Sequence, residues 1–167
     1  AKPLDTVSCC FSKGLGAPVG SAVSGDKATI ARVFRFRKMF GGAMRQSGIL
    51  AAAALYALEN HRDRLSEDHA NAARLAEGLG NLPGVTIPMA VETNMVFIDL
   101  GKRHGTAADV CAKMKAEGVL ALPTAPHRIR FVCHLDVTRD MIERAVTGLS
   151  KLLGGESKPA TRSMAHA

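Results

Sequence analysis

The segment from Lys13 to Gly25 constrains the fold of this chain more than any other. Its glycines at 14, 16 and 20, together with Pro18, exclude a helix there. The preceding residues 5–12 alternate apolar and polar side chains, as a buried strand does. A second short strand over 19–24 is expected to return from this turn. Because two strands alone do not make a stable sheet, this half of the chain predicts part of a larger layer.

Three helices are expected after the second strand. Asp26 is a plausible N-cap for a helix over 27–39, where apolar residues recur at helical spacing, and Gly41 and Gly42 end it. An alanine-rich helix is expected from about residue 43 to residue 59. A third helix over 65–79 should stop at Gly80 and Pro83.

The pattern changes after Pro83. Thr106 and Thr138 are expected to cap helices over 107–117 and 139–152. Short strands are expected over 85–88, 95–100, 119–122 and 129–133. The order β-β-α-β-β-α predicts a compact α+β module. We therefore expect one domain over 1–80, a second over 81–153, and a disordered tail over 154–167.

Composition excludes several classes of protein. With 47% hydrophobic residues among 167, the chain is too apolar to be disordered. Its longest apolar run, Ile49 to Leu58, is about half of the roughly 18 residues that a membrane span needs, so no membrane partner is expected. Without Trp and with one Tyr, it offers few stacking surfaces for single-stranded nucleic acid. The net charge of +7 fits an anionic partner or an ordinary basic surface.

The four cysteines show no CxxC spacing, so neither a zinc site nor a redox motif is predicted. The histidines are dispersed, and we expect no metal. Cys133, His134 and Asp136 suggest a catalytic group, but a plain connection between a strand and a helix is the favoured interpretation. Reduced, mostly buried thiols indicate a cytoplasmic protein.

Lys13 is the most informative polar residue. The glycines that follow it superficially resemble a dinucleotide fingerprint, but Pro18 lies where the helix of that motif should run. One interpretation of Lys13 is a solvated lysine at a strand end. The other is a lysine whose unprotonated amine forms an imine with a carbonyl cofactor. The basic cluster around Arg37 to Arg45 could then bind a phosphate on that cofactor.

Two long motifs, SKGLGAPVGS and FRFRKMFGGAMRQSGILAAAALYAL, resemble the C-terminal half of low-specificity L-threonine aldolases, and RIRFVCHLDVTRD resembles their C-terminal domain. The resemblance covers about residues 5–153. It implies an α/β fold: the C-terminal part of a fold-type I pyridoxal 5'-phosphate enzyme, with a fragment of the large parallel-sheet domain and a complete small α+β domain.

The resemblance also implies roles for individual residues. Lys13 matches the lysine that forms the imine with pyridoxal phosphate, and Ser12 could orient it. Arg130 matches the arginine that binds the α-carboxylate of the substrate. Lys38 and Arg45 match basic residues near the active site at a subunit boundary, which suggests a role in binding the cofactor phosphate or the substrate.

The implied activity is a retro-aldol cleavage of threonine or allo-threonine to glycine and acetaldehyde. Family members are about twice as long, and Ala1 in place of Met suggests a segment upstream. We expect the N-terminal half of the same enzyme as a partner, in a homo-oligomer (a dimer or tetramer). The alternatives are a silent fragment or interaction module, a related lyase acting on another β-substituted amino acid, and an anion-binding or nucleic-acid-binding module.

Overall fold

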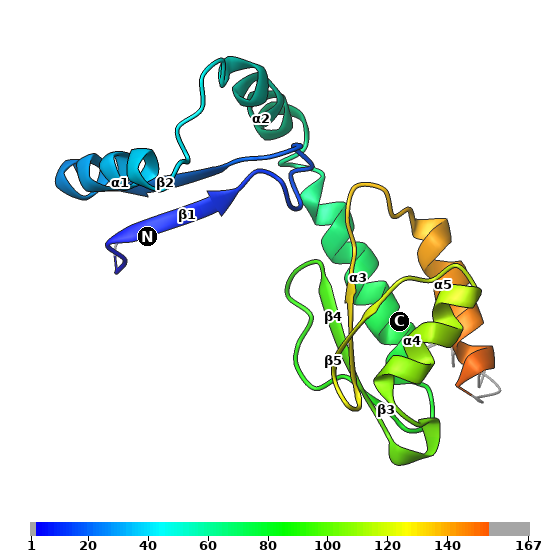
Figure 1. Cartoon of the computed structure of the whole chain (residues 1–167). Coiled ribbons are helices and arrows are strands. Elements are labelled where there is room, and N and C mark those ends of the chain that lie inside the picture. The colour runs from blue at the N-terminus through cyan, green and yellow to red at the C-terminus, as the bar shows by residue number, and fades with distance from the viewer. Residues whose placement is uncertain (1–2, 154–167) are drawn as a thin grey trace, which may run out of the picture. The chain divides into compact units, whose positions relative to one another are not determined.

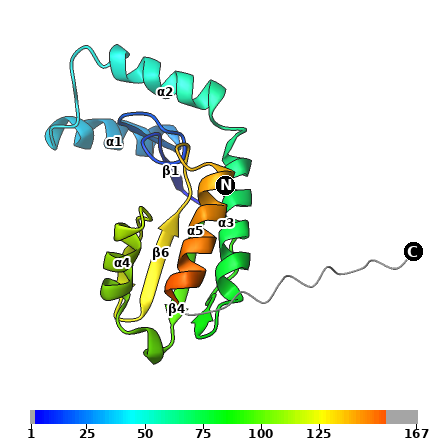
Figure 2. The same ribbon diagram turned by 90° about the vertical axis from the view of Figure 1, so that its right-hand side faces the viewer.

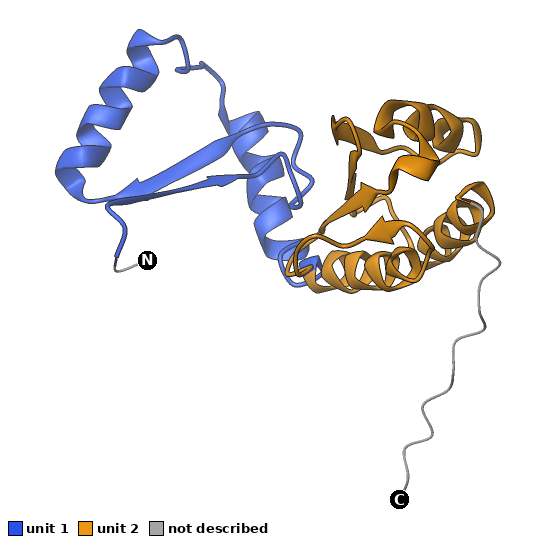
Figure 3. Ribbon diagram, turned by 90° about the horizontal axis from the view of Figure 1, so that it is seen from below, with its two compact units in different colours: residues 1–65 blue, residues 66–167 orange. Residues whose placement is uncertain are grey.

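The computed structural model describes residues 3–153, and the expected disordered tail lies outside them. The chain forms two compact units, Ala1–Leu65 and Ser66–Ala167 (Figure 3). We expected the division after residue 80. It falls earlier because Leu75 and Leu79, on the helix that begins at Leu65, are buried in the core of the second unit.

The first unit contains two strands and two helices (Figure 1). Strand β1 (Thr6–Cys10) pairs antiparallel with β2 (Ser21–Gly25), so that Thr6 lies opposite Gly25. Helices α1 (Lys27–Met39) and α2 (Gly48–Asn60) follow. The strand, turn, strand and helix order predicted for this part is confirmed.

Local signals explain where these helices begin. Asp26 caps α1 as predicted, because its carboxylate accepts a hydrogen bond of 2.9 Å from the backbone N–H of Thr29. Helix α2 begins at Gly48, later than the predicted residue 43. Gln46 adopts a φ of 53°, in the left-handed region that interrupts a helix, and residues 45–47 form a turn instead.

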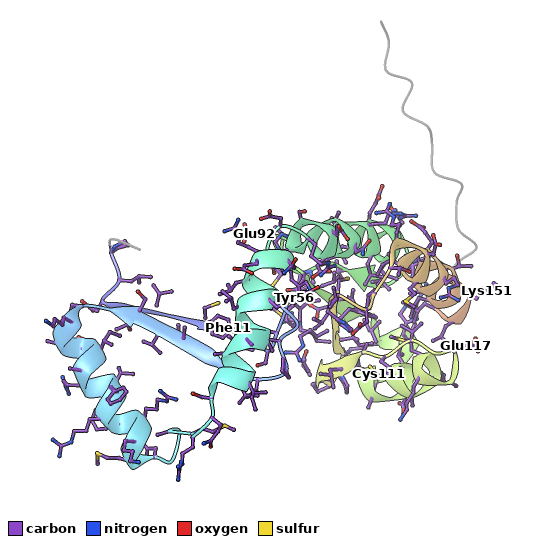
Figure 4. All side chains as sticks on the ribbon, turned by 90° about the horizontal axis from the view of Figure 1, so that it is seen from above. Phe11, Tyr56, Glu92, Cys111, Glu117 and Lys151 are labelled. Carbon is purple, nitrogen blue, oxygen red and sulfur yellow. The ribbon has the colours of Figure 1, made fainter. Side chains whose placement is uncertain are left out.

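The first unit buries little, and the prediction that β1 is a buried strand is wrong for this chain. Val7 on β1 and Val23 on β2 are 41% and 42% exposed. Alternation shows which residues share a face, but burial also needs a second layer, and α1 itself has no buried residue. A small core among its described residues joins Leu15, Ala17 and Ala57 with the partly buried Phe11 and Leu65. Figure 4 shows the side chains of both units on the ribbon.

The second unit has a full α+β architecture. Its elements are α3 (Leu65–Gly80), β3 (Val85–Thr86), β4 (Met95–Leu100), the 3-10 turn η1 (Lys102–His104), α4 (Ala107–Ala116), β5 (Leu122–Ala125), β6 (Arg128–Val132) and α5 (Arg139–Leu152). The four strands form an antiparallel sheet in the order β3-β4-β6-β5. The predicted order β-β-α-β-β-α is confirmed, and Figure 2 shows β6 beside the helices of this unit.

One core holds the second unit together. Alternate residues of β4 and β6 are buried with side chains from all three helices, and the largest fully buried side chains include Leu79, Ile98, Met114, Ile129 and Leu149. Burial of each such side chain stabilises a fold by about 1.5–3 kcal/mol. The opposite side chains of β4 and β6 therefore face away from this core.

Strand β5 differs from the prediction. We expected it over 119–122, but Gly118 ends α4 with a φ of 79°, and the N–H of Val119 donates to the carbonyl of Met114. Because residues 118–119 belong to this helix end, pairing with β6 begins only at Leu122. The register then shifts between Pro123 and Ala125, which is a bulge on the edge strand.

Helix boundaries elsewhere follow the predicted caps. Thr106 and Thr138 accept hydrogen bonds from the N–H groups of Asp109 and Met141, and α5 spans the predicted residues. None of the helices in residues 3–153 combines the length and apolar character that crossing a bilayer requires.

The contact between α3 and α5 gives a stability prediction. A Cβ at Gly78 would lie 2.6 Å from Cγ1 of Val146, whereas a Cβ at Gly148 would meet nothing within 4 Å. Gly78→Ala should lower the free energy of unfolding by about 1–3 kcal/mol through overpacking. Gly148→Ala, the matched control, should leave it unchanged or raise it by up to about 1 kcal/mol. Urea unfolding of the chain measures both, and equal effects would contradict the tight helix contact.

Candidate functional site

Lys13 lies in a tight turn between β1 and β2. The N–H of Phe11 donates to the carbonyl of Gly20 (2.9 Å), and the N–H of Ala17 donates to the carbonyl of Phe11 (2.9 Å). The N–H of Gly16, which has a φ of 72°, donates to the carbonyl of Lys13 itself (2.8 Å). These bonds fix the backbone of the turn, and glycine at position 16 supplies the left-handed conformation that the turn needs.

The end of α2 anchors this turn from the other side. Nδ1 of His61, as the N–H tautomer, donates to the carbonyl of Leu15 at 2.7 Å. Leu15 is buried against Ala57, and a Cβ at Gly14 would lie 3.0 Å from Cδ2 of Leu65. The Lys13 side chain is exposed. A fixed backbone with a free amine is the arrangement that a covalent cofactor lysine needs.

Arg130 lies on β6, opposite Phe97 of β4. Its neighbours Ile129 and Phe131 are buried in the core, so the Arg130 side chain belongs to the other face of the sheet. Its Nε is buried and has no hydrogen-bond partner within residues 3–153. A buried donor left without an acceptor costs free energy, and a planar carboxylate is the acceptor that fits a guanidinium best.

A second arginine shares this face. Arg128 binds Asp99 through two hydrogen bonds, Nε to Oδ1 at 2.6 Å and Nη2 to Oδ2 at 2.8 Å. The hydrogen bonds from Arg128 hold the pKa of Asp99 below its ordinary value, and the same pair raises the pKa of Arg128. Asp99 therefore stays ionised, and Arg128 is already paired with a carboxylate where Arg130 is not.

The structure does not gather all the predicted site residues in one place. Lys13 and Arg130 belong to different units. Within the first unit, the Lys13 turn contacts the C-terminal end of α2, whereas Lys38 and Arg45 precede its N-terminal end. Because α2 has 13 residues, its ends lie about 20 Å apart.

Cys133, His134 and Asp136 form a connection between β6 and α5, as the favoured interpretation stated. Burial, with the charge of Asp68 adding to it, raises the pKa of the Cys133 thiol to about 11. Nδ1 of His134 faces Asp136, at 3.4 Å from its backbone N and 3.5 Å from Oδ2. A buried thiol that stays protonated is a poor nucleophile. Across residues 3–153 we find no group of three or more His, Cys, Asp or Glu that could hold a metal.

Two contributors to the site were missed from the sequence. His61 was noted only as one dispersed histidine, and Asp99 only as part of a strand. His61 lies 46 positions from Leu15, and Asp99 lies 29 positions from Arg128. Alternation along β4 and β6 could have shown that Asp99 and Arg128 share an outward face, but not that they lie opposite each other.

Comparisons with known proteins place this geometry in context. A family model described as beta-eliminating lyase matches residues 1–103. The low specificity L-threonine aldolase of Escherichia coli K12 is 49% identical over 138 residues, which cover 83% of this chain and 40% of that protein. Low-specificity L-threonine aldolase 1 of Arabidopsis thaliana is 44% identical over 140 residues, covering 82% and 39%. The chain thus spans about 40% of the length of the curated relatives it matches.

Solved structures agree on the fold. A Listeria monocytogenes protein assigned as an L-allo-threonine aldolase superposes with a TM-score of 0.70 at 19% identity, covering 89% of this chain and 45% of that one. The 8-amino-7-oxononanoate synthase of Francisella tularensis gives a TM-score of 0.65 at 22% identity, covering 86% and 44%. The fold is that of part of a fold-type I pyridoxal-phosphate enzyme, as the sequence predicted.

The His61 bond gives a prediction about the Lys13 turn. His61→Ala should speed amide hydrogen exchange at Gly16 and Ala17 and lower the free energy of unfolding by about 1 kcal/mol, because the carbonyl of Leu15 loses its donor. His69→Ala, which removes an exposed histidine from α3, serves as the control. Unchanged exchange at Gly16 in the His61 variant would show that this bond does not hold the turn.

The raised pKa values of the buried thiols predict which cysteines react with an alkylating reagent. Burial raises the pKa values of Cys111 and Cys133, so their reactive thiolates are disfavoured below about pH 9, while Cys9 is exposed. At pH 8, iodoacetamide should label Cys9 in the folded chain, and Cys111 and Cys133 only after unfolding in guanidinium. Peptide mass spectrometry measures the labelling. Equal labelling of Cys133 and Cys9 in the folded chain would contradict the burial.

Proposed function

Because this chain belongs to the beta-eliminating lyase family, we propose that it forms the lysine-bearing part of a pyridoxal-phosphate-dependent carbon–carbon lyase. The proposed reaction cleaves threonine or allo-threonine to glycine and acetaldehyde. The observation that supports it most is the Lys13 turn, whose backbone is fixed while its amine is exposed. The identity to threonine aldolases from a bacterium and a plant supports the choice of substrate.

The residues of this chain fit the cofactor and its substrate. Lys13 would hold pyridoxal phosphate through Nζ, which must be unprotonated to bond to a carbonyl carbon. When bound, the cofactor supplies an electron sink for the carbanion that forms when the Cα–Cβ bond of the amino acid breaks. The fit rests on the exposed amine and on the unpaired Nε of Arg130, a donor suited to a carboxylate.

Arg130 would bind the α-carboxylate of the substrate. Two parallel N–H donors of a guanidinium fix both position and plane of a carboxylate, so the substrate is oriented as well as held. Orientation matters because the bond to be broken must lie in a favourable geometry for its electrons to leave Cα. Phe97, opposite Arg130 on the neighbouring strand, offers an apolar wall for the arginine.

Lys38 and Arg45 are proposed to act in the site of a neighbouring subunit. Lys38 lies near the C-terminal end of α1 and Arg45 lies in the connection from α1 to α2, whereas the Lys13 turn contacts the C-terminal end of α2. A homodimer or homotetramer would let them bind the cofactor phosphate or the substrate across a subunit boundary. We further propose that the N-terminal half of the enzyme completes the site and that the enzyme is cytoplasmic.

Two measurements test this function. The 167-residue chain alone should bind pyridoxal phosphate weakly, since it spans about 40% of its relatives, whereas the complete enzyme should show a stable visible absorbance band with the cofactor. Lys13→Ala in the complete enzyme should abolish both the band and turnover. Lys27→Ala, an exposed lysine at the start of α1, is the matched control.

Near-normal turnover in the Lys13 variant would refute the role of Lys13. Loss of threonine cleavage but retention of activity on another β-substituted amino acid would favour the related lyase. A complete gene product that neither binds the cofactor nor cleaves any of these amino acids would favour an interaction module.

A further inference from the structure

The open face of the sheet in the second unit brings three charged groups together. Val96, Ile98 and Leu100 of β4 and Ile129 and Phe131 of β6 are buried, so Phe97 and Asp99 share the opposite face with Arg128 and Arg130. On this face Phe97 is paired with Arg130, and Asp99 with Arg128.

The ladder between β4 and β6 shows how close these side chains lie. The N–H of Cys133 donates to the carbonyl of Asn94, which marks Asn94 and Cys133 as a hydrogen-bonded pair. Because bonded and non-bonded pairs alternate in an antiparallel ladder, the pairs at Arg130 and Arg128 are non-bonded pairs. In such pairs the Cα atoms lie about 4.5 Å apart and the side chains are closest.

Asp99 therefore has two arginines within reach. Arg128 lies directly opposite, and Arg130 is its diagonal neighbour, about 7–8 Å away between Cα atoms, a distance that a long side chain spans. In the structure both oxygens of Asp99 are taken by Arg128, at 2.6 Å and 2.8 Å. The side chain of Arg130 makes no hydrogen bond or ion pair with the described residues.

This distribution of bonds matters for an arginine that must bind a ligand. A guanidinium already paired with a carboxylate of its own protein must give up that pair before it can accept a carboxylate from outside. An unpaired guanidinium with a buried N–H has no such cost and gains an acceptor. Asp99 would be an internal competitor for Arg130 if both of its oxygens were free.

We propose that Arg128 is a positioning residue that occupies both oxygens of Asp99 and so keeps Arg130 available for the substrate carboxylate. The inference rests on the proposed function, because it takes Arg130 as the carboxylate-binding group. The ion pair between Arg128 and Asp99 then sets the affinity of Arg130 for the amino acid, although neither residue contacts the amino acid.

The first test needs no activity. In the 167-residue chain labelled with 15N-arginine, the Nε–H signal of Arg130 is identified by its loss in Arg130→Lys. In Arg128→Gln this signal should move downfield, because Asp99 is freed and binds Arg130. In the double variant Asp99→Asn/Arg128→Gln it should return to its original position. An unmoved Arg130 signal in Arg128→Gln overturns the proposal.

The control separates this effect from loss of stability. Arg74 of α3 binds Glu143 of α5 with the same two-bond geometry, at 2.9 Å and 2.7 Å. Arg74→Gln breaks an equivalent pair in the same unit, remote from this face of the sheet, and should leave the Arg130 signal in place. A shift in the Arg74 variant equal to that in Arg128→Gln would mean a general loss of structure and would also overturn the proposal.

The second test uses the complete enzyme. Arg128→Gln should raise KM for threonine about tenfold, the effect of one competing charge-assisted pair, with kcat within about twofold. The double variant should bring KM back to within about twofold of the original, because the competitor is gone. An unchanged KM in Arg128→Gln, or a double variant no better than the single, overturns the inference.

The variant Arg130→Ala distinguishes failure of the positioning role of Arg128 from failure of the proposed function of Arg130. If it raises KM strongly while Arg128→Gln does not, the positioning role fails and the proposed function stands. If Arg130→Ala leaves KM unchanged, Arg130 does not bind the carboxylate, and its part in the proposed function fails together with the role of Arg128.

Discussion

The alternation of β6 between a packed face and an open face is the constraint on which the rest of the second unit depends. Ile129 and Phe131 are buried under the helices, and this burial fixes the strand in one register. A slip by one residue would place Arg128 and Arg130 in the apolar core, at a cost of several kcal/mol for each charge. Packing of the buried face therefore fixes the positions of Arg128 and Arg130 on the open face of the sheet.

Different interactions stabilise the two units. The second has a continuous core shared by one sheet and three helices. The first relies on a two-stranded ladder, a small cluster around Leu15, and the bond from His61. Segments with few buried apolar contacts open at low free energy, so the Lys13 turn belongs to the less stable part of the chain. A cofactor bound through Lys13 would stabilise the state that binds it, and the turn with it.

How well the sequence predicted each element depended on how local its signal is. Helices α1 and α5 were placed correctly because Asp26 and Thr138 cap them within three residues. Strand β5 was misplaced because Gly118 redirects residues whose composition alone favours a strand. The exposure of β1 could not be predicted, since alternation identifies an apolar face but not the layer that covers it.

The site shows the same limit. Lys13 and Arg130 carry their signal in nearby sequence, and the structure shows features that suit their predicted roles without testing them. Two neighbouring bonds, from His61 to Leu15 and from Arg128 to Asp99, span 46 and 29 positions of sequence. Only the pairing of strands and the packing of α2 bring such residues together. The roles of Lys38 and Arg45, which the resemblance implied at a subunit boundary, stay predictions.

The edge strands of the two sheets differ in how readily a further strand can pair with them. In the second unit β3 has two residues and β5 carries a proline and a bulge, and both features stop a further strand from joining. In the first unit β1 and β2 contain no charged residue and no proline, and each has only the other as a partner in the described part of the chain. The hairpin that carries Lys13 therefore keeps backbone N–H and C=O groups on the outer edges of both strands, to which a strand of another chain can add.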